Sequence, residues 1–288
     1  MPLVPEGDTV WRTARHLDEA LTGLVLQRSD FRMPALATVD LAGAEVLGTV
    51  SRGKHLLTRF GPVPPGSDGS GPALTLHTHL KMEGSWHLYR PGSRWRRPAH
   101  EARVVLVTET WTAVGFALGT VELVETGTES DVLPHLGPDL LGPDWDADEA
   151  VRRLAASPDR PVGEALLDQR NLAGIGNLYK SELCFLLGVN PWTPVSQVDL
   201  PRLVRRAKAV LEANKERVEQ TTTGDLRRGR RTWVYRRDGQ PCRRCGTPIR
   251  VAMAEPGVTG IGVTGRARSD REDSVAERAT YWCPTCQR

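Results

Sequence analysis

The sequence predicts a multidomain α+β protein, with an N-terminal β-sandwich and flanking helices followed by a helical domain and a small cysteine-rich unit. Three observations favour this fold. Short apolar runs with strand-like alternation fill residues 24–124, helical apolar periodicity fills most of residues 126–231, and two Cys-x-x-Cys pairs lie within residues 232–288. The predicted domains therefore cover residues 1–125, 126–231 and 232–288.

The N-terminal domain begins with a predicted helix over residues 8–22. Asp8 or Thr9 can cap this helix, and apolar residues recur at helical spacing from Val10 to Leu21. Turn-rich segments then separate short strands, in the spacing typical of an all-β sandwich. The strand-like runs are Glu45–Val50, His55–Arg59, Leu74–Leu80, Ala102–Val107 and Thr112–Leu118.

After about residue 125 the apolar spacing becomes helical, and prolines punctuate the gaps. The predicted helices are Asp146–Ala156, Val162–Leu167, Ile175–Leu187 and Leu200–Glu219. A β-rich half before a helical half predicts two domains with a cleft between them. In the third unit Trp233–Arg236 is strand-like, and residues 254–276 hold almost no large apolar side chains, which predicts a flexible insertion.

Composition and charge narrow the class of protein. With 39% hydrophobic residues and no run of about 18 apolar residues, no membrane-spanning helix is predicted. The N-terminus lacks the basic and apolar regions of a signal peptide, so a cytoplasmic location is expected. The net charge is +3, but Lys and Arg cluster between Arg202 and Arg237, as either a solvated helix face or a phosphate-binding surface.

Four of the five cysteines form two pairs, Cys242 with Cys245 and Cys283 with Cys286. Turn residues flank each pair, as in two knuckles that hold one tetrahedral Zn²⁺ ion. Four thiolates leave no open position for water, so the predicted zinc is structural. Two disulfides and a redox pair are the alternatives, and an intracellular location disfavours disulfides.

Three further residues are expected to be structural. Cys184 lies in an apolar helical run and is predicted to be a core residue. His77 and His79 alternate on a strand and could resemble metal ligands. Because no third ligand is evident nearby, packing or hydrogen-bonding roles are favoured for both.

Four segments in order carry a resemblance to a known family. PEGDTV at 5–10 resembles the opening of endonuclease VIII proteins, and SRGKHLL at 51–57 resembles their lysine hairpin. LDQRNLAGIGNLYKSE at 167–182 resembles the helix-two-turn-helix signature, and RATYWCPTCQ at 278–287 the end of the zinc finger. The chain therefore resembles the endonuclease VIII and formamidopyrimidine-DNA glycosylase family, in particular its actinobacterial endonuclease VIII members.

The resemblance implies a helix-two-turn-helix domain and a zinc finger behind the sandwich. It also implies a bifunctional DNA glycosylase and abasic-site lyase of base excision repair, which removes oxidised bases, mainly pyrimidines, and cleaves by β,δ-elimination. The implied partner is damaged DNA bound in the cleft by a monomer, with no nucleotide cofactor, at the bacterial nucleoid. Preference for oxidised purines, or a non-catalytic zinc-finger protein that binds damaged or single-stranded DNA, are the alternatives.

By the same resemblance, Pro5 is the nucleophile that forms a Schiff base with the sugar, and Glu6 is the acid that assists ring opening. An α-amino group has a reference pKa near 8, against about 10.4 for lysine, so more of it is a free nucleophile at neutral pH. Lys54 corresponds to the hairpin lysine that contacts phosphate and donates a proton in β-elimination. Arg278 corresponds to the finger arginine implicated in phosphate binding and δ-elimination.

DNA-binding residues are implied in two other segments. Asn177, within GIGN, corresponds to the family asparagine that binds the DNA backbone. An enzyme that flips a nucleotide must also fill the space left in the base stack. Met82 occupies the position of the intercalating residue, and Lys81 is a candidate for contacts beside the lesion; a core role for Met82 is the alternative.

The chain also departs from the family pattern. Pro5 is preceded by four residues, and an acylated proline nitrogen cannot act as the nucleophile, so translation is expected to start at Val4 with removal of the initiator methionine. Residues 111–126 lack the arginine-rich wedge loop of the formamidopyrimidine branch, which favours endonuclease VIII. The insertion at 254–276 leaves the metal site possible, because loop-closure entropy grows slowly with length.

Overall fold

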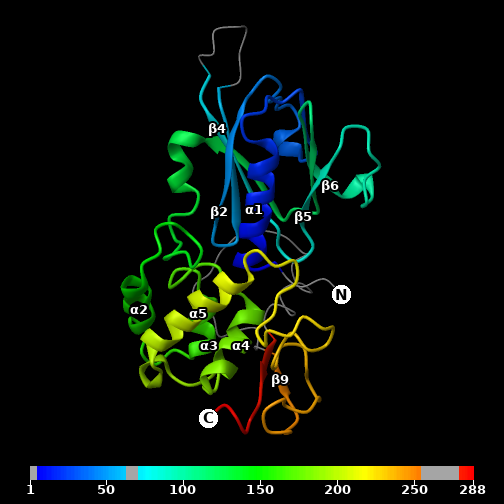
Figure 1. Ribbon diagram of the computed structural model, residues 1–288. Helices are drawn as coiled ribbons and strands as arrows, with labels where there is room; N and C mark the ends of the chain where they lie inside the picture. Colours follow the sequence, from blue (N-terminus) through cyan, green and yellow to red (C-terminus); the bar gives the residue numbers. More distant parts are fainter. Residues whose placement is uncertain (1–4, 63–70, 254–278) are drawn as a thin grey trace. The chain divides into compact units, whose positions relative to one another are not determined.

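The computed structural model describes residues 5–62, 71–253 and 279–288. The chain divides into two compact units, Met1–Leu136 and Gly137–Arg288 (Figure 1). The first unit holds helix α1 and two β-sheets, and the second holds the remaining α-helices and the four paired cysteines. In the described part of the chain no helix is long and apolar enough to cross a membrane.

The first unit is a β-sandwich of two antiparallel four-stranded sheets, with strand orders β1-β6-β7-β5 and β2-β3-β4-β8. Helix α1 (Gly7–Leu21) packs against β2 and β3. The strands are β1 (Arg28–Phe31), β2 (Val46–Arg52), β3 (His55–Phe60), β4 (Leu74–His79), β5 (Ser85–Tyr89), β6 (Ala102–Val107), β7 (Thr112–Phe116) and β8 (Thr120–Glu125). Short 3₁₀ helices η1 (Pro34–Leu36), η2 (Ala99–Glu101) and η3 (Thr126–Asp131) lie between or after them.

One apolar core joins the two sheets and α1. Leu17 from α1, Leu56 and Leu76 from one sheet and Val104 and Leu106 from the other are all almost fully buried in it. The position of α1 is fixed by a polar contact as well, because the carboxylate of Asp18 accepts a hydrogen bond from the backbone N–H of Thr49 in β2 at 2.8 Å. The predicted sandwich is confirmed.

The second unit contains helices α2 (Ala147–Ala155), α3 (Val162–Leu167), α4 (Asn177–Leu187) and α5 (Leu200–Asn214), the 3₁₀ helix η4 (Val195–Gln197), and a small hairpin of β9 (Arg250–Ala252) and β10 (Thr280–Trp282). The caps explain several helix ends. Asp146 and Asp199 accept backbone N–H groups in the first turns of α2 and α5, and Gly188 ends α4 in the left-handed conformation (φ 73°).

Two predicted elements differ most from the structure. Helix α5 ends at Asn214 instead of Glu219, because the Asn214 side chain both donates to and accepts from the backbone of Thr221 and turns the chain back. The strand expected at Trp233–Arg236 is wrong. Three consecutive N–H groups there donate to one carboxylate, whereas a strand directs successive N–H groups to opposite sides.

Candidate functional site

Pro5 lies directly before α1, and Glu6 is the N-cap residue of that helix. The Glu6 backbone is extended, its carbonyl oxygen accepts the N–H of Val10 at 3.0 Å, and its side chain has 0% exposure. A helix N-terminus favours a negative charge, which offsets part of the cost of burying a carboxylate there. The two residues to which the sequence assigns the chemistry therefore lie just before the first turn of a packed helix.

Lys54 lies at the tip of the β2–β3 hairpin. Arg52 pairs with His55, so Gly53 and Lys54 form a two-residue turn, and Gly53 has a positive φ of 58°. Such a turn requires glycine at its first central position when it is of type II′. The Lys54 side chain is half-buried. The glycine in the sequence motif thus has a geometric role, namely to project the lysine from a tight hairpin.

A second turn carries Lys81 and Met82. The N–H of Gly84 donates to the carbonyl of Leu80 at 2.8 Å, and a Cβ at Gly84 would lie 2.3 Å from that oxygen, so only glycine fits. Lys81 adopts a left-handed conformation (φ 52°), which is strained for a residue with a side chain. Lys81 is exposed and Met82 is half-buried. Met82 is therefore in a turn beyond the end of β4, and not in the core of the sandwich.

The connection between β7 and β8 is short. Only Ala117, Leu118 and Gly119 separate the two strands, and a Cβ at Gly119 would lie 2.1 Å from Cγ of Lys81. Ala117 has a positive φ of 46°. A connection of three residues is too short to form a long wedge loop, in agreement with the absence of such a loop predicted from residues 111–126.

Three histidines meet on the sheet behind these turns. His55 and His77 are hydrogen-bonded, Nδ1 to Nε2, at 2.8 Å, and His77 Nδ1 contacts Glu122 Oε2 at 3.0 Å. His79 Nδ1 accepts the backbone N–H of Lys81 at 2.9 Å. The hydrogen-bonding roles expected for His77 and His79 are confirmed, whereas His55 and Glu122 had no assigned role in the sequence. Strand register is the signal that unites them, because His55 pairs with His79 and His77 pairs with Glu122.

In the second unit, helix α4 holds the strand that follows Arg278. Asn177 Nδ2 donates to the carbonyl oxygen of Ala279 at 2.5 Å, and Lys180 Nζ donates to the hydroxyl of Thr280 at 2.8 Å. Both side chains are buried. Arg278 itself lies outside the described residues, so its predicted role is not addressed by the geometry.

Glu182, also in α4, is fully buried and accepts four hydrogen bonds. The donors are the N–H groups of Trp233, Val234 and Tyr235, each at 2.8 Å, and the hydroxyl of Thr222. Burial raises the pKa of Glu182, and these donors act in the opposite direction. Glu182 had no role assigned from the sequence, and it ties α4 to the segment leading into the cysteine pairs.

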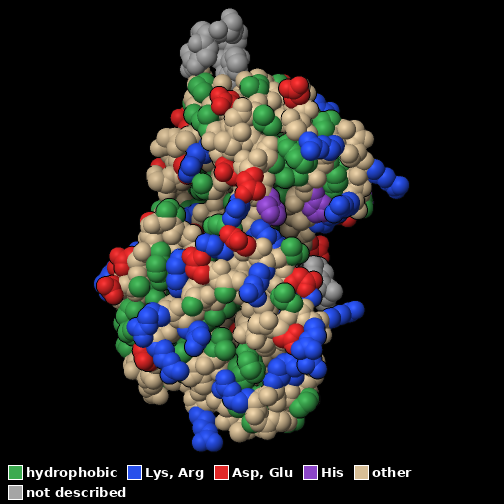
Figure 2. Space-filling model, in the orientation of Figure 1, with side chains coloured by type: hydrophobic (Ala, Val, Ile, Leu, Met, Phe, Trp, Pro, Cys, Tyr) green, Lys and Arg blue, Asp and Glu red, His purple; other side chains and the backbone are tan. Residues whose placement is uncertain are grey.

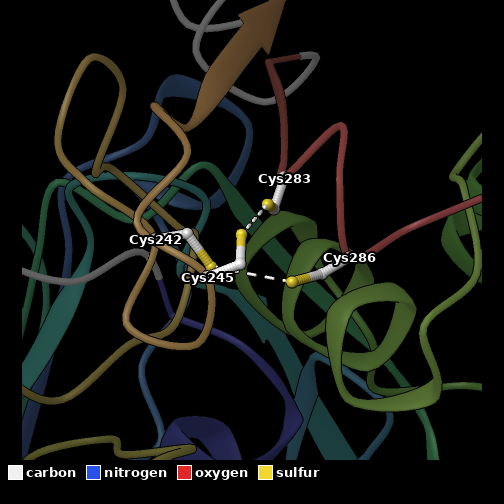
Figure 3. Close-up of side chains that lie close together, drawn as sticks. All are labelled: Cys242, Cys245, Cys283 and Cys286. Carbon is white, nitrogen blue, oxygen red and sulfur yellow. Dashed lines mark hydrogen bonds between the residues drawn. The ribbon is translucent and has the colours of Figure 1, made fainter.

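The four paired cysteines come together although 37 residues separate Cys245 from Cys283 in sequence (Figure 3). Their sulfur atoms all lie within 4.8 Å of one another, with Cys242 and Cys286 at 3.9 Å and Cys245 and Cys283 at 3.4 Å. These distances exclude disulfides, whose sulfurs are about 2.05 Å apart. They are close to the roughly 3.8 Å between ligands of a tetrahedral Zn–S₄ centre with 2.3 Å bonds. The cluster could bind a metal ion.

A small apolar core of the second unit surrounds the cysteine cluster. Cys242 and Cys283 are buried in a small core with Phe185, Val234 and Ile249. Hydrogen bonds from Thr247 lower the pKa of the Cys245 thiol to about 6, whereas burial raises that of Cys286 to about 12. Thiols held so close together without a cation resist joint ionisation, and a divalent ion would relieve that repulsion. Cys184, in contrast, is buried in α4 away from this set, as the sequence predicted.

The basic residues between Arg202 and Arg237 are spread over the second unit, where Figure 2 shows many Lys and Arg side chains at the surface. Several are ion-paired, such as Arg227 with Asp225 and Lys208 with Glu212. Arg202, Arg205 and Arg206 are exposed on one face of α5. The cluster is thus partly a paired surface and partly an exposed basic helix face.

Two family models match the chain in succession. The formamidopyrimidine-DNA glycosylase N-terminal domain matches residues 4–118, and the formamidopyrimidine-DNA glycosylase H2TH domain matches residues 136–225. The chain belongs to the formamidopyrimidine-DNA glycosylase and endonuclease VIII family. The order of the two domains is that of the β-sandwich and of the helices α2 to α5.

Relatives of similar length support the assignment of the chain to this family. The chain is 52% identical to the "Probable endonuclease 8 2" of Streptomyces coelicolor, over 99% of this chain and 94% of that protein. It is 46% identical to the "DNA-(apurinic or apyrimidinic site) lyase Nei2" of Mycolicibacterium smegmatis, over 99% of both. The enzyme is thus a DNA glycosylase and abasic-site lyase of base excision repair.

The fold of the glycosylase also matches solved structures. A Lactococcus lactis formamidopyrimidine-DNA glycosylase bound to DNA with an abasic site has a TM-score of 0.74 and 20% sequence identity, over 98% of this chain and 99% of that one. At this identity the likeness establishes the fold alone.

Proposed function

We propose that this glycosylase removes oxidised pyrimidines from damaged DNA through a Schiff base on Pro5 and then cleaves the strand by β,δ-elimination. The single observation that carries the proposal is the pair Pro5–Glu6 at the start of α1, where a proline nitrogen precedes a fully buried carboxyl group. We further propose that it acts as a cytoplasmic monomer at the bacterial nucleoid, without a nucleotide cofactor.

The chemistry requires a free secondary amine at Pro5. Its lone pair attacks C1′ of the damaged nucleotide, the glycosidic bond breaks, and the base leaves with the bonding electrons. Ring opening, with Glu6 as the acid for the sugar oxygen, gives an iminium ion. Loss of a C2′ proton sends the C2′–H bonding electrons into this cation and gives an enamine. The enamine then expels the 3′ phosphate, which leaves with the C3′–O bonding electrons. The reaction therefore needs a chain whose first residue is Pro5, which we propose arises from translation starting at Val4 and removal of the initiator methionine.

Lys54 is proposed to contact a phosphate near the lesion and to donate a proton during β-elimination. Its place at the tip of a tight hairpin supports this role, because a rigid turn fixes the origin of a flexible side chain. Met82 is proposed to enter the base stack and Lys81 to contact DNA beside it. Their position in the strained turn after β4 supports both roles, since strained backbone is frequent at ligand-binding sites.

The cysteine cluster is proposed to hold one structural Zn²⁺ ion through Cys242, Cys245, Cys283 and Cys286. The sulfur distances fit a tetrahedral S₄ site, which is the usual ligand set of a structural Zn²⁺ ion. The ion would fix the fold of the finger and supply no water for catalysis. Arg278 is then proposed to bind phosphate and assist δ-elimination, and Asn177 to bind the DNA backbone near the finger.

The test compares two forms of the protein, one that begins at Pro5 and one that begins at Met1. Each is incubated with an abasic-site duplex and borohydride, and then with duplexes that carry thymine glycol or 8-oxoguanine. Covalent trapping by the Pro5 form alone, with preferential release of thymine glycol, is the expected result. Trapping equally strong with the Met1 form would exclude Pro5 as the nucleophile.

Two further outcomes separate the alternatives. Faster excision of 8-oxoguanine than of thymine glycol would replace pyrimidines by purines as the substrate class. Tight binding to abasic DNA by the Pro5 form, without trapping or cleavage, would instead indicate a non-catalytic damage-binding protein. A Glu6→Gln variant of the Pro5 form serves as the chemical control, because it keeps the size of the side chain and removes the acid.

A further inference from the structure

A polar row of side chains lies on one face of the sheet β2-β3-β4-β8, opposite the face that lines the core. Antiparallel pairing places His55 beside His79 and His77 beside Glu122, and side chains two residues apart on a strand share a face. The other face carries Leu56, Phe60 and Leu76 in the core. Three histidines and one carboxylate are thereby brought onto the same surface of the sheet, at the end of β3 that carries Lys54.

Hydrogen bonds link these residues into a chain. Glu122 Oε2 and His77 Nδ1 are 3.0 Å apart, and His77 Nε2 and His55 Nδ1 are 2.8 Å apart. The Glu122 side chain is 57% exposed and that of His77 only 5% exposed, so the chain runs inward from the surface. When His77 is neutral, it donates to Glu122 and accepts from the Nδ1–H of His55, which leaves the lone pair of His55 on Nε2.

His79 is fixed separately. Its Nδ1 accepts the backbone N–H of Lys81 at 2.9 Å, so the neutral ring carries its proton on Nε2. This bond stabilises the left-handed conformation of Lys81 (φ 52°), which starts the turn with Met82. The ring of His55 packs edge-on against that of His79, with centroids 4.7 Å apart. The two turns that carry Lys54 and Lys81 therefore rest on the same imidazole pair.

The pair stays uncharged at neutral pH. Burial, followed by the charges around it, lowers the pKa of His55 to about 3 and that of His79 to about 2. Because both rings are neutral, Lys54 and Lys81 can lie beside them without repulsion from an imidazolium charge. The negative charge of Glu122 lies at the other end of the hydrogen-bonded row. The titratable and charged groups that face the pair come from β2, β3, β4, β8 and the neighbouring turns, namely Arg52, Lys54, His77, Lys81, Glu122 and His135.

A metal site is a poorer explanation of the same residues. Three or more side chains that bind one ion must bring their ligand atoms close together. Among the described residues the four cysteines meet this condition, with ligand atoms within 4.8 Å of one another, and the three histidines do not. One nitrogen of each of His77 and His79 is already used by a carboxylate or a backbone N–H. The geometry is that of a hydrogen-bonded support.

We propose that Glu122, His77 and His55 form a hydrogen-bonded chain that positions Lys54 for its work on the abasic site, and that His79 positions the turn of Lys81 and Met82. These are positioning residues, which act through the lysines and the turn. The inference rests on the proposed function of Lys54, and its consequence is that a surface carboxylate on β8 influences the lyase step through side chains on the same face of the sheet.

The main test is a double-mutant cycle in the form of the protein that traps abasic DNA with borohydride. Glu122→Gln and His77→Asn each interrupt the chain, and we expect each to slow single-turnover strand cleavage at a preformed abasic site by about threefold to tenfold. The double variant should be no slower than either single variant. In a Lys54→Arg background, Glu122→Gln should change the rate by less than about twofold, because the chain then has no lysine to position.

Glu125→Gln is the matched control, since it removes a carboxylate from the same strand, on its other face and outside the chain. It should leave the cleavage rate unchanged. An unchanged rate in Glu122→Gln, or an equal loss with and without the Lys54→Arg substitution, would overturn the proposal. Circular dichroism and thermal unfolding of each variant exclude loss of fold as the cause.

A second measurement does not depend on activity. Imidazole ¹⁵N spectra of the DNA-free protein should show His55 and His79 neutral from about pH 5 to about pH 8, with the proton of His79 on Nε2. A cationic His55 or His79 at pH 6 would overturn the proposal even if the cleavage rates agreed. If the parent protein neither traps nor cleaves abasic DNA, the proposed function fails, whereas these spectra still decide whether the neutral support exists.

Discussion

Asn177, the first residue of α4, donates a hydrogen bond from Nδ2 to the carbonyl oxygen of Ala279 at 2.5 Å. The helix of the GIGN motif is thereby joined to the residue that follows Arg278. Lys180, one turn along the helix, contacts the same carbonyl at 3.4 Å and the hydroxyl of Thr280 at 2.8 Å. An asparagine expected to bind DNA is therefore also a support for the start of β10.

Asn177→Asp should destabilise the second unit by about 1–3 kcal/mol, because it places a buried carboxylate oxygen against a carbonyl oxygen and removes the donor. Urea unfolding followed by tryptophan fluorescence measures this loss. Gln197→Glu makes the same type of change at an exposed side chain of η4 and should alter stability little. Equal stability of the two variants would show that the contact with Ala279 contributes nothing.

Glu182→Gln should reduce the free energy of unfolding more than Asn177→Asp does. The carboxylate oxygens of Glu182 face the three N–H groups of residues 233–235 and the hydroxyl of Thr222, and the new amide would direct its own N–H atoms at those donors. We expect a loss of about 2–4 kcal/mol in the second unit, together with faster proteolysis near residue 233. Glu164→Gln, at a carboxylate of α3 that is 43% exposed, is the control. A Glu182→Gln protein as stable as that control would contradict the prediction.

The sequence predicted most of the sandwich because its strands alternate between a buried and a polar face. The predicted ranges for β6 and α3 match the structure, and the other predicted helices and strands that form differ by one to five residues at their ends. Strands β1, β5 and β8 of the sandwich were not among the predicted runs. Strand β1 is only four residues long, and β5 and β8 are half-buried over most of their length, so none of them carries a strong apolar signal.

The site was less predictable where it depends on register and long-range contacts. The cysteine spacing was enough to anticipate the cluster of four sulfurs, because ligands of one ion must converge. In contrast, the contact between His55 and His77 depends on which residues of β3 and β4 pair, and that register is set by the two-residue turn at Gly53. The strand expected at Trp233–Arg236 failed because Glu182, 51 residues earlier, captures its N–H groups.

The half-buried His55 and His79 should make the first unit sensitive to mild acid. Burial lowers the pKa of His55 to about 3 and of His79 to about 2, against about 6.5 in the unfolded chain. Between these limits the unfolded chain binds more protons, so stability is fully present above pH 6.5 and falls as the pH drops below it. Each histidine contributes a slope of up to about 1.4 kcal/mol per pH unit.

Denaturant unfolding of the parent, His79→Gln and His100→Gln at pH 7, 6 and 5 measures this slope. His79→Gln should reduce the slope of stability against pH by up to about 1.4 kcal/mol per pH unit, since glutamine does not titrate. His100→Gln, at an exposed position in η2, should keep the parent slope. A parent slope that persists in His79→Gln would mean that other groups cause the acid sensitivity.

Metal removal tests the cysteine cluster. The protein should carry one Zn²⁺ ion per chain. The Cys242→Ser variant should lose this ion, because a hydroxyl oxygen replaces one of the four thiolates. The sulfur of Cys242 lies 3.9 Å from that of Cys286, and the sulfurs of Cys245 and Cys283 are 3.4 Å apart. Without the ion the small core of Phe185, Val234 and Ile249 loses its cross-link, so proteolysis of residues 232–288 should accelerate and abasic-site cleavage should fall. Cys184→Ala is the matched control, since it removes the buried cysteine outside the cluster and should retain the full zinc content. Zinc content that is the same in Cys242→Ser and Cys184→Ala, measured by elemental analysis, would rule out the four-sulfur site.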